Sequence, residues 1–90
     1  MKNKKPTPYS EVLLQVGQRL KELRKNAGYK SYEHIAYDLE MSRSAYWRLE
    51  KGNNFELKTL IKVCVLLNVS LEDFFEGVNF PKPSGKLKRR

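Results

Sequence analysis

Residues 31–52 read SYEHIAYDLEMSRSAYWRLEKG, and this stretch decides the fold. Ser31 and Ser42 each stand where a serine hydroxyl can accept a hydrogen bond from a backbone N–H in the first turn of a helix. The stretch therefore predicts two short helices, one over about residues 32–39 and one over 43–51, with a glycine ending the second. A short turn separates them, and such a turn sets two helices at roughly 90–120°. The second helix can thus project from the surface.

The predicted helix over 43–51 has two different faces. Its inward side is formed by Ala45, Tyr46 and Leu49. Its outward side has no acidic residue and consists of Arg43, Ser44, Trp47, Arg48 and Lys51. The major groove of DNA admits one helix, arginine can bond both acceptors of a guanine, and lysine can meet a phosphate. The pattern therefore favours contact with DNA, and the alternative for the exposed Trp47 is a protein interface.

The rest of the sequence predicts three more helices. The first begins after the cap Ser10 and ends at Gly28, and the fourth runs from about residue 56 to 67 and ends at Asn68. The fifth opens with the capping-box pair Ser70 and Asp73. The side chains of the fourth helix that we expect to face the core are Leu57, Leu60, Ile61, Cys64 and Leu67. No segment alternates apolar and polar residues, so the prediction is an all-α chain of five short helices.

The formal net charge of +8 comes from the two ends of the chain. Eight basic residues lie before Tyr9 or after Gly77 with no acidic residue among them: Lys2, Lys4, Lys5, Lys82, Lys86, Lys88, Arg89 and Arg90. We therefore divide the chain into a basic flexible arm (1–9), a helical domain (10–77) and a basic irregular tail (78–90). Positive ends of this kind can hold a polyanion, and they can equally serve only solubility.

The sequence lacks the residue patterns of an enzyme or a metal site. His34 and Cys64 are the only histidine and cysteine, and they fall on different predicted helices. No glycine-rich phosphate loop or metal-ligand spacing occurs, so we expect no cofactor and no metal. No apolar run approaches the ~20 residues of a membrane-spanning helix. A single cysteine fits a reducing compartment, and we expect a cytoplasmic protein without a membrane partner.

From Val16 to Phe75 the chain resembles the helix-turn-helix domain of the phage repressor and Cro family, the xenobiotic-response-element-like regulators. The matching segments are GQRLKELR at 17–24, Ile35-Ala36, SRS at 42–44, RLEKG at 48–52, and Leu60 through VSLEDFF at 69–75. The resemblance implies a lambda-repressor-like fold, binding of double-stranded DNA in transcriptional regulation, and a homodimer. No cofactor is implied.

The resemblance also assigns roles to individual positions. The residues expected to read bases are Arg43, Ser44, Trp47 and Arg48. The residues expected to contact phosphates are Tyr32, Ser42, Lys51 and Asn53. Arg24 and Glu50 match a buried ion pair that joins the first helix to the third. A dimer is the expected companion, and the residues expected at its interface, because they follow the core helices, are Phe75, Val78 and Phe80. The alternative is that Phe74 packs in the core with Leu71 and only Phe80 is exposed.

Three features depart from the family pattern. Tyr32 replaces a frequent glutamine, the loop over 28–31 is one residue longer than in the phage proteins, and Glu40 stands where the turn often has glycine. If the backbone of Glu40 is left-handed, the glutamate costs roughly 1–2 kcal/mol. The rival interpretation is an antitoxin or an interaction scaffold with the same fold, whose partner is a protein such as a toxin.

Overall fold

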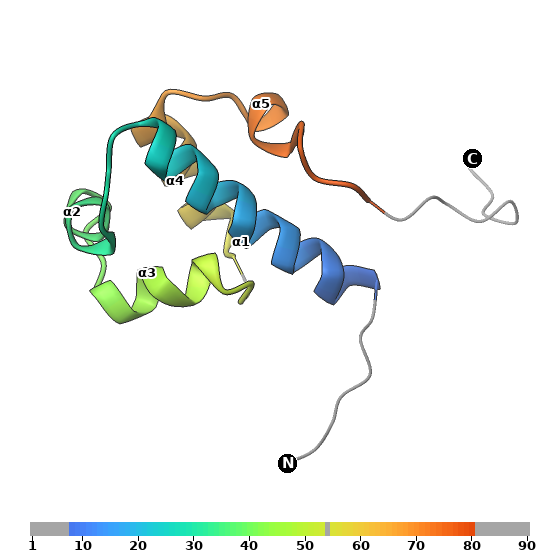
Figure 1. Cartoon of the computed structure of the whole chain (residues 1–90), viewed down its shortest axis with the longest axis horizontal. Helices are drawn as coiled ribbons and strands as arrows, with labels where there is room; N and C mark the ends of the chain where they lie inside the picture. The colour runs from blue at the N-terminus through green and yellow to red at the C-terminus, as the bar shows by residue number, and fades with distance from the viewer. Residues whose placement is uncertain (1–7, 54, 81–90) are drawn as a thin grey trace, which may run out of the picture.

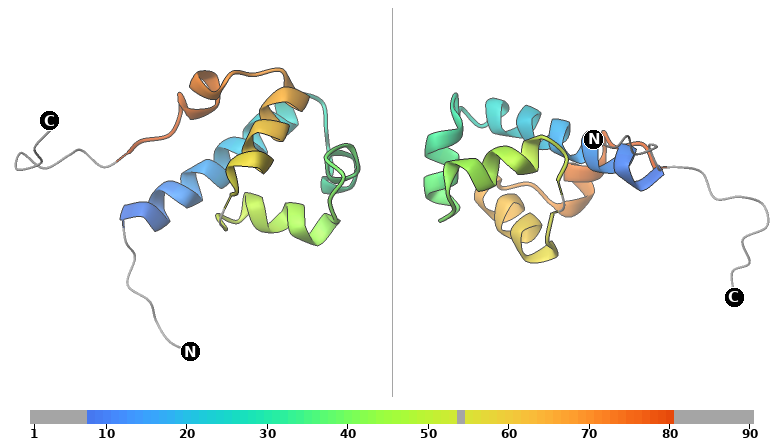
Figure 2. Two further views of the ribbon diagram at one scale, coloured as in Figure 1. Left: turned by 180° about the vertical axis from the view of Figure 1, so that it is seen from behind. Right: turned by 90° about the horizontal axis from the view of Figure 1, so that it is seen from below.

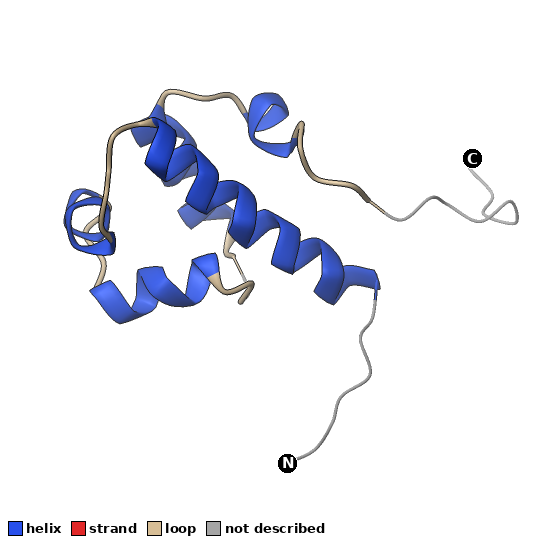
Figure 3. Ribbon diagram, viewed as in Figure 1, coloured by secondary structure: helices blue, strands red, loops and turns tan. Residues whose placement is uncertain are grey.

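The computed structural model describes residues 8–53 and 55–80, and these residues form five α-helices with no strand among them (Figures 1 and 3). The helices are α1 (Pro8–Asn26), α2 (Tyr32–Asp38), α3 (Arg43–Glu50), α4 (Leu57–Leu67) and α5 (Leu71–Phe75). The predicted all-α class with five helices is confirmed. Within the described part of the chain, none of the helices combines the length and the apolarity needed to span a membrane.

One core joins all five helices. In Figures 1 and 2, α1 crosses the molecule, with α2 and α3 along one side, α5 on the other, and α4 behind. Helix α1 packs against α3 and α5, α2 against α3, and α4 against α5. Each helix contributes one of the largest fully buried side chains: Leu20, Ile35, Tyr46, Val63 and Phe74. Tyr46 thereby anchors the short helix α3 in the centre of the domain.

Helices α1 to α4 all end in the same motif. Within two residues of the end of each helix, a single residue has a left-handed backbone. These residues are Gly28, Glu40, Gly52 and Asn68. The next N–H then bonds the carbonyl five residues earlier, as Met41 does with Ala36 at 3.0 Å. This motif satisfies carbonyls that a helix end leaves free, and it favours glycine or asparagine in the left-handed position. Asparagine tolerates this region better than most side chains, so Glu40, with φ of 61°, is the least suited of these four residues to its backbone conformation.

The start of α1 corrects the predicted boundary of the N-terminal arm. The helix begins at Pro8, two residues before the predicted cap Ser10, so Pro8 and Tyr9 belong to the domain. Proline is well suited to the first turn because it lacks an N–H that would stay unbonded there. Residues 1–7 of the predicted arm lie outside the described residues.

Serine caps occur at two of the other predicted positions. The hydroxyl oxygens of Ser42 and Ser70 accept from the N–H groups of Ala45 and Asp73, both at 3.0 Å. Ser31 also precedes its helix with an extended backbone, but its side chain makes no capping hydrogen bond. The local sequence therefore located the start of all three helices. The capping hydrogen bond to a serine hydroxyl forms at two of them.

The C-terminal boundary also needs correction, because the domain continues past residue 77. The side chain of Val78 is 7% exposed and belongs to the core. The side-chain amide of Gln15 clamps the backbone of Asn79: its Oε1 accepts from the N–H at 2.7 Å, and its Nε2 donates to the carbonyl at 3.1 Å. The ring of Phe80 lies 5.9 Å from that of Phe75. Residues 81–90 of the predicted tail lie outside the described residues.

Helix α4 is rotated relative to the prediction. Leu57 and Ile61, expected inward, are 64% and 45% exposed, whereas Leu60, Val63 and Cys64 are buried. Leu67, also expected inward, is half-buried. The sequence LKTLIKVCVLL is apolar on almost every side, so its pattern does not define which face packs inward.

Candidate nucleic-acid interface

Helix α3 has one buried side and one exposed side. Tyr46, Leu49 and Glu50 are buried, and Ala45 is half-buried. The exposed residues are Arg43, Ser44, Trp47, Arg48 and Lys51. Trp47 is 42% exposed, a large value for an aromatic residue of this size. The outward set predicted from the sequence is therefore accessible on one side of a helix that the core holds from the other.

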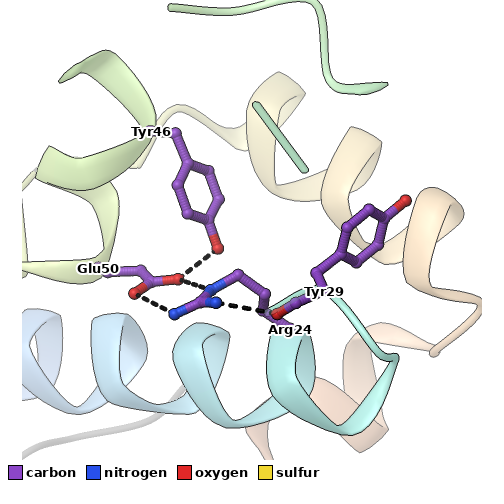
Figure 4. A network of polar contacts seen from close by, with 4 residues as sticks. All are labelled: Arg24, Tyr29, Tyr46 and Glu50. Carbon is purple, nitrogen blue, oxygen red and sulfur yellow. Dashed lines mark hydrogen bonds and ion pairs between the residues drawn. The ribbon is translucent and has the colours of Figure 1, made fainter. Parts of the chain in front are cut away.

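A buried polar network fixes the end of α3 to α1 (Figure 4). Arg24 Nε donates to Glu50 Oε2 at 2.7 Å, and the Tyr46 hydroxyl donates to the same oxygen. Arg24 Nη1 also donates to the carbonyl of Tyr29 at 2.9 Å, in the loop that follows α1. The side chains of Arg24 and Glu50 are only 4% and 3% exposed. The expected ion pair thus lies in the interior and connects α1, this loop and α3.

The network keeps its members in their hydrogen-bonding forms. The hydrogen bond with Glu50 raises the pKa of Arg24, against the opposing effect of burial. Burial, followed by the hydrogen bond with Glu50, raises the pKa of Tyr46. Arg24 stays charged and Tyr46 stays neutral at physiological pH. The Glu50 carboxylate is therefore compensated inside the protein, away from the cations on the outer side of α3.

Gly17 allows α1 to approach the last turn of α3. A Cβ atom at this position would lie 2.6 Å from the Glu50 carbonyl oxygen and 2.8 Å from that of Leu49. Real Cβ atoms do not approach backbone oxygens so closely, so only glycine fits here without movement of a helix. The sequence analysis placed Gly17 on the helix but missed this role, because the close contact is tertiary.

A hollow of about 550 Å³ lies between the start of α2 and the start of α3. We call it the α2–α3 hollow, and it is lined by Ser31, Tyr32, Glu33, Arg43, Ser44 and Trp47. Four residues with predicted DNA contacts, Tyr32, Arg43, Ser44 and Trp47, therefore meet around one concave surface. Two of its lining side chains are aromatic, one is a cation and one is an anion.

Tyr32 holds its place by packing. Its ring centroid lies 6.0 Å from that of Tyr46 and 5.3 Å from the guanidinium carbon of Arg24. The side chain is half-buried, so one part of the ring rests on the buried network and another lines the hollow. The position at which the resemblance led us to expect a glutamine thus holds an aromatic ring that packs near a cation.

Arg48 lies on α3, and two further predicted contacts, Lys51 and Asn53, lie just after its end. Arg48 and Asn53 border a second hollow, of about 440 Å³, together with Glu56 and Thr59 near the start of α4. Lys51 does not line this hollow, and its Nζ atom lies 5.1 Å from the centre of the Trp47 ring. The predicted set is therefore spread along α3, with Trp47 and Lys51 in mutual contact.

Sequence reasoning missed Glu33. Its Oε2 accepts a hydrogen bond from Arg43 Nη1 at 2.6 Å, and the two side chains are 62% and 64% exposed. The available signal was a carboxylate in the first turn of one helix and an arginine in the first turn of the next, separated by a short turn. That signal is weak, because the pairing depends on the angle between the helices.

The expected dimer contacts need one correction. Val78 is buried in the core and is not free to contact a second chain. Phe80 is 58% exposed and Phe75 is half-buried, so these two remain at or near the surface.

The single histidine and the single cysteine, the residues most often used in catalysis or metal binding, do not lie together. His34 is exposed on α2, whereas Cys64 is buried on α4, where burial raises the pKa of its thiol. Among residues 8–53 and 55–80, no three His, Cys, Asp or Glu side chains gather in a way that could hold a metal ion.

Comparison with known proteins agrees with this architecture. A family model described as a helix-turn-helix domain matches residues 15–74, which is two thirds of the chain. Domains of this family are typically non-catalytic and are associated with DNA binding. No curated protein matches the chain significantly. The matched region contains α2, the turn, α3 and the buried network, and the chain therefore belongs to the helix-turn-helix domain family.

Proposed function

We propose that this protein is a cytoplasmic transcriptional regulator of the phage repressor and Cro type, which binds specific sites in double-stranded DNA with α3 in the major groove. The observation that carries the proposal is the division of α3 into a side fixed in the core and an exposed side with three cations and a tryptophan. A rigid helix with such a side can approach base edges, because the major groove is wide enough for one helix.

The proposed base-reading residues are Arg43, Ser44, Trp47 and Arg48. Both arginines are exposed, and an arginine fork can donate to both O6 and N7 of a guanine. Trp47 offers an apolar surface to a thymine methyl group or a sugar. Each good bidentate contact with a base contributes about 1–3 kcal/mol of discrimination.

The proposed phosphate contacts flank this set. Ser42 lies at the N-terminus of α3, where the positive end of the helix dipole favours an anion. Tyr32 lines the α2–α3 hollow, and Lys51 and Asn53 lie at the other end of α3. Phosphate contacts set the position of the protein on the duplex without reading its sequence.

We propose that two copies bind together, as an approximately palindromic site would require. Two recognition helices of a dimer typically contact half-sites about 34 Å apart. The contact would involve Phe80, which is exposed and lies against Phe75, without the buried Val78. Sedimentation of the protein with and without its DNA site tests this: Phe80→Ala should shift the protein toward the monomer.

Selection from random duplexes, followed by titration at two salt concentrations, tests the function. We expect a preferred sequence, and Arg43→Ala or Arg48→Ala should each lower the preference by about 1–3 kcal/mol at one base pair. Lys21→Ala, which removes an exposed cation from α1, is the matched control and should leave the preference unchanged. Failure of the selection to enrich any sequence would contradict the proposal. The rival antitoxin or scaffold function predicts that result together with a tightly bound protein partner.

A further inference from the structure

One ion pair between described residues lies where the outer side of α3 adjoins the start of α2. Its acidic member is Glu33, and an acid is unexpected on a surface proposed to contact DNA. Glu33 Oε2 lies 2.6 Å from Arg43 Nη1, across the gap between α2 and α3. A carboxylate that faces a polyanion weakens binding through repulsion. Glu33 thus lowers the positive charge of the surface proposed to contact DNA.

The pair does little for the stability of the fold. Both side chains are more than 60% exposed, and exposed pairs of this kind contribute little because water screens them and both side chains lose freedom. A carboxylate in the first turn of a helix is favourable, which is the structural alternative for Glu33. That alternative explains an acid at this position but not its contact with Arg43.

The contact leaves the arginine able to bind a base. A guanidinium has five N–H donors in one plane, and the bond with Glu33 uses one of those on Nη1. The donors on Nε and Nη2 stay available for the two acceptors of a guanine. Since the carboxylate accepts in the plane of the guanidinium, it restricts the direction in which the remaining donors point.

We propose that Glu33 is a specificity-determining positioning residue that holds the Arg43 guanidinium toward one base. The proposal rests on the function proposed above. Glu33 lowers affinity for every duplex through its charge and raises discrimination at the base pair that Arg43 reads. Selectivity and affinity therefore respond in opposite directions when its charge is removed.

Glu33→Gln tests this with a matched control in the same chain. Glu22 also pairs with an arginine, Arg19, at 3.0 Å and with similar exposure of the carboxylate, but it lies on α1. Dissociation constants are measured for the selected site, for the same site with the Arg43 base pair replaced, and for a random duplex. The dissociation constant of the replaced site divided by that of the selected site measures discrimination. This ratio cancels any loss of folded protein, because both constants come from one variant.

We expect Glu33→Gln to reduce this ratio about threefold to fivefold, as expected for the loss of an exposed pair, and to tighten binding to the random duplex. Glu22→Gln should leave the ratio unchanged. In an Arg43→Ala background, Glu33→Gln should no longer affect the ratio but should still tighten binding to the random duplex. An unchanged ratio in the single variant, a higher ratio, or an equal loss in both backgrounds would overturn the proposal.

A second measurement separates this proposal from the proposed function. Nitrogen NMR of the free protein reports the ordering of the Arg43 guanidinium, which Glu33→Gln should loosen and Glu22→Gln should not. An ordered guanidinium in a wild-type protein without sequence preference would mean that the proposed function is wrong and that Glu33 supports no base reading. A disordered guanidinium in a protein that does discriminate would overturn the role of Glu33 alone.

Discussion

Arg24 and Glu50 join the first helix to the end of the third through an ion pair of 2.7 Å that is almost completely buried. The Tyr46 hydroxyl donates to the same carboxylate, and Arg24 also bonds the loop after α1. No buried side-chain nitrogen or oxygen among the described residues lacks a hydrogen-bond partner. This satisfied network fixes the direction in which α3 leaves the core.

Removal of one partner from this pair should strongly destabilise the domain. Glu50→Leu leaves the Arg24 charge buried without its partner, and such a loss typically costs about 3–5 kcal/mol. Urea unfolding followed by circular dichroism measures the change. Glu22→Gln, whose carboxylate is 59% exposed on the same helix as Arg24, is the control and should change the free energy of unfolding by less than about 1 kcal/mol.

Replacement of the whole network should cost much less than removal of one partner. The triple variant Arg24→Met, Glu50→Leu and Tyr46→Phe leaves no buried charge and no unpaired hydroxyl, and apolar replacements of buried pairs are often neutral. A triple variant no more stable than Glu50→Leu alone would contradict this account.

Gly17→Ala should destabilise the protein although alanine favours helices. In an exposed helix the change would gain about 1 kcal/mol. Here the new Cβ would lie 2.6 Å from the Glu50 carbonyl oxygen, so α1 and α3 must separate, and overpacking of this kind typically costs about 1–3 kcal/mol. Thermal unfolding measures the result. Gly77→Ala is the control, because its nearest neighbours are Arg19 side-chain atoms at 3.7 Å, an ordinary contact distance. A stabilised Gly17→Ala variant would refute the close approach.

The sequence predicted what depends on near neighbours. Ser42 and Ser70 mark helix starts, and Gly28 and Asn68 mark helix ends, because capping involves residues within one turn. The all-α fold followed from these signals and from the apolar spacing. The exposed side of α3 followed in the same way, since Tyr46 and Leu49 define its buried side.

What the sequence did not predict depends on contacts between distant residues. The rotation of α4 is set by neighbouring helices, since Leu57 and Leu60 are equally apolar. The clamp on Asn79 requires Gln15, sixty-four residues away. The Glu33–Arg43 pair depends on the angle between two helices. None of these contacts leaves more than a weak local signal in the chain.

Glu40→Gly should stabilise the protein. Glu40 has a φ of 61°, and a side chain in this left-handed region costs roughly 1–2 kcal/mol, which glycine avoids. Glycine loses more backbone freedom on folding, so we expect a net gain of about 1 kcal/mol in the free energy of unfolding. Glu40→Ala is the control: it removes the same charge, keeps the Cβ atom, and should give no such gain. Equal gains in both variants would show that charge rather than backbone conformation is responsible.

The stability of the domain should fall at alkaline pH because of Tyr46. Burial and the bond to Glu50 raise its pKa in the folded state above the ordinary value of about 10. The unfolded chain therefore releases the phenolic proton first, so the stabilisation is complete below about pH 10 and is lost as the pH rises further. This group alone contributes a slope of at most about 1.4 kcal/mol per pH unit.

Urea unfolding of the wild type and of Tyr46→Phe, compared between about pH 8 and pH 11, isolates the contribution, since every other titrating group is common to both. The wild type should be the more stable protein at the lower pH, and the difference should shrink above pH 10. A difference that stays constant over this range would show that Tyr46 does not keep its proton through burial.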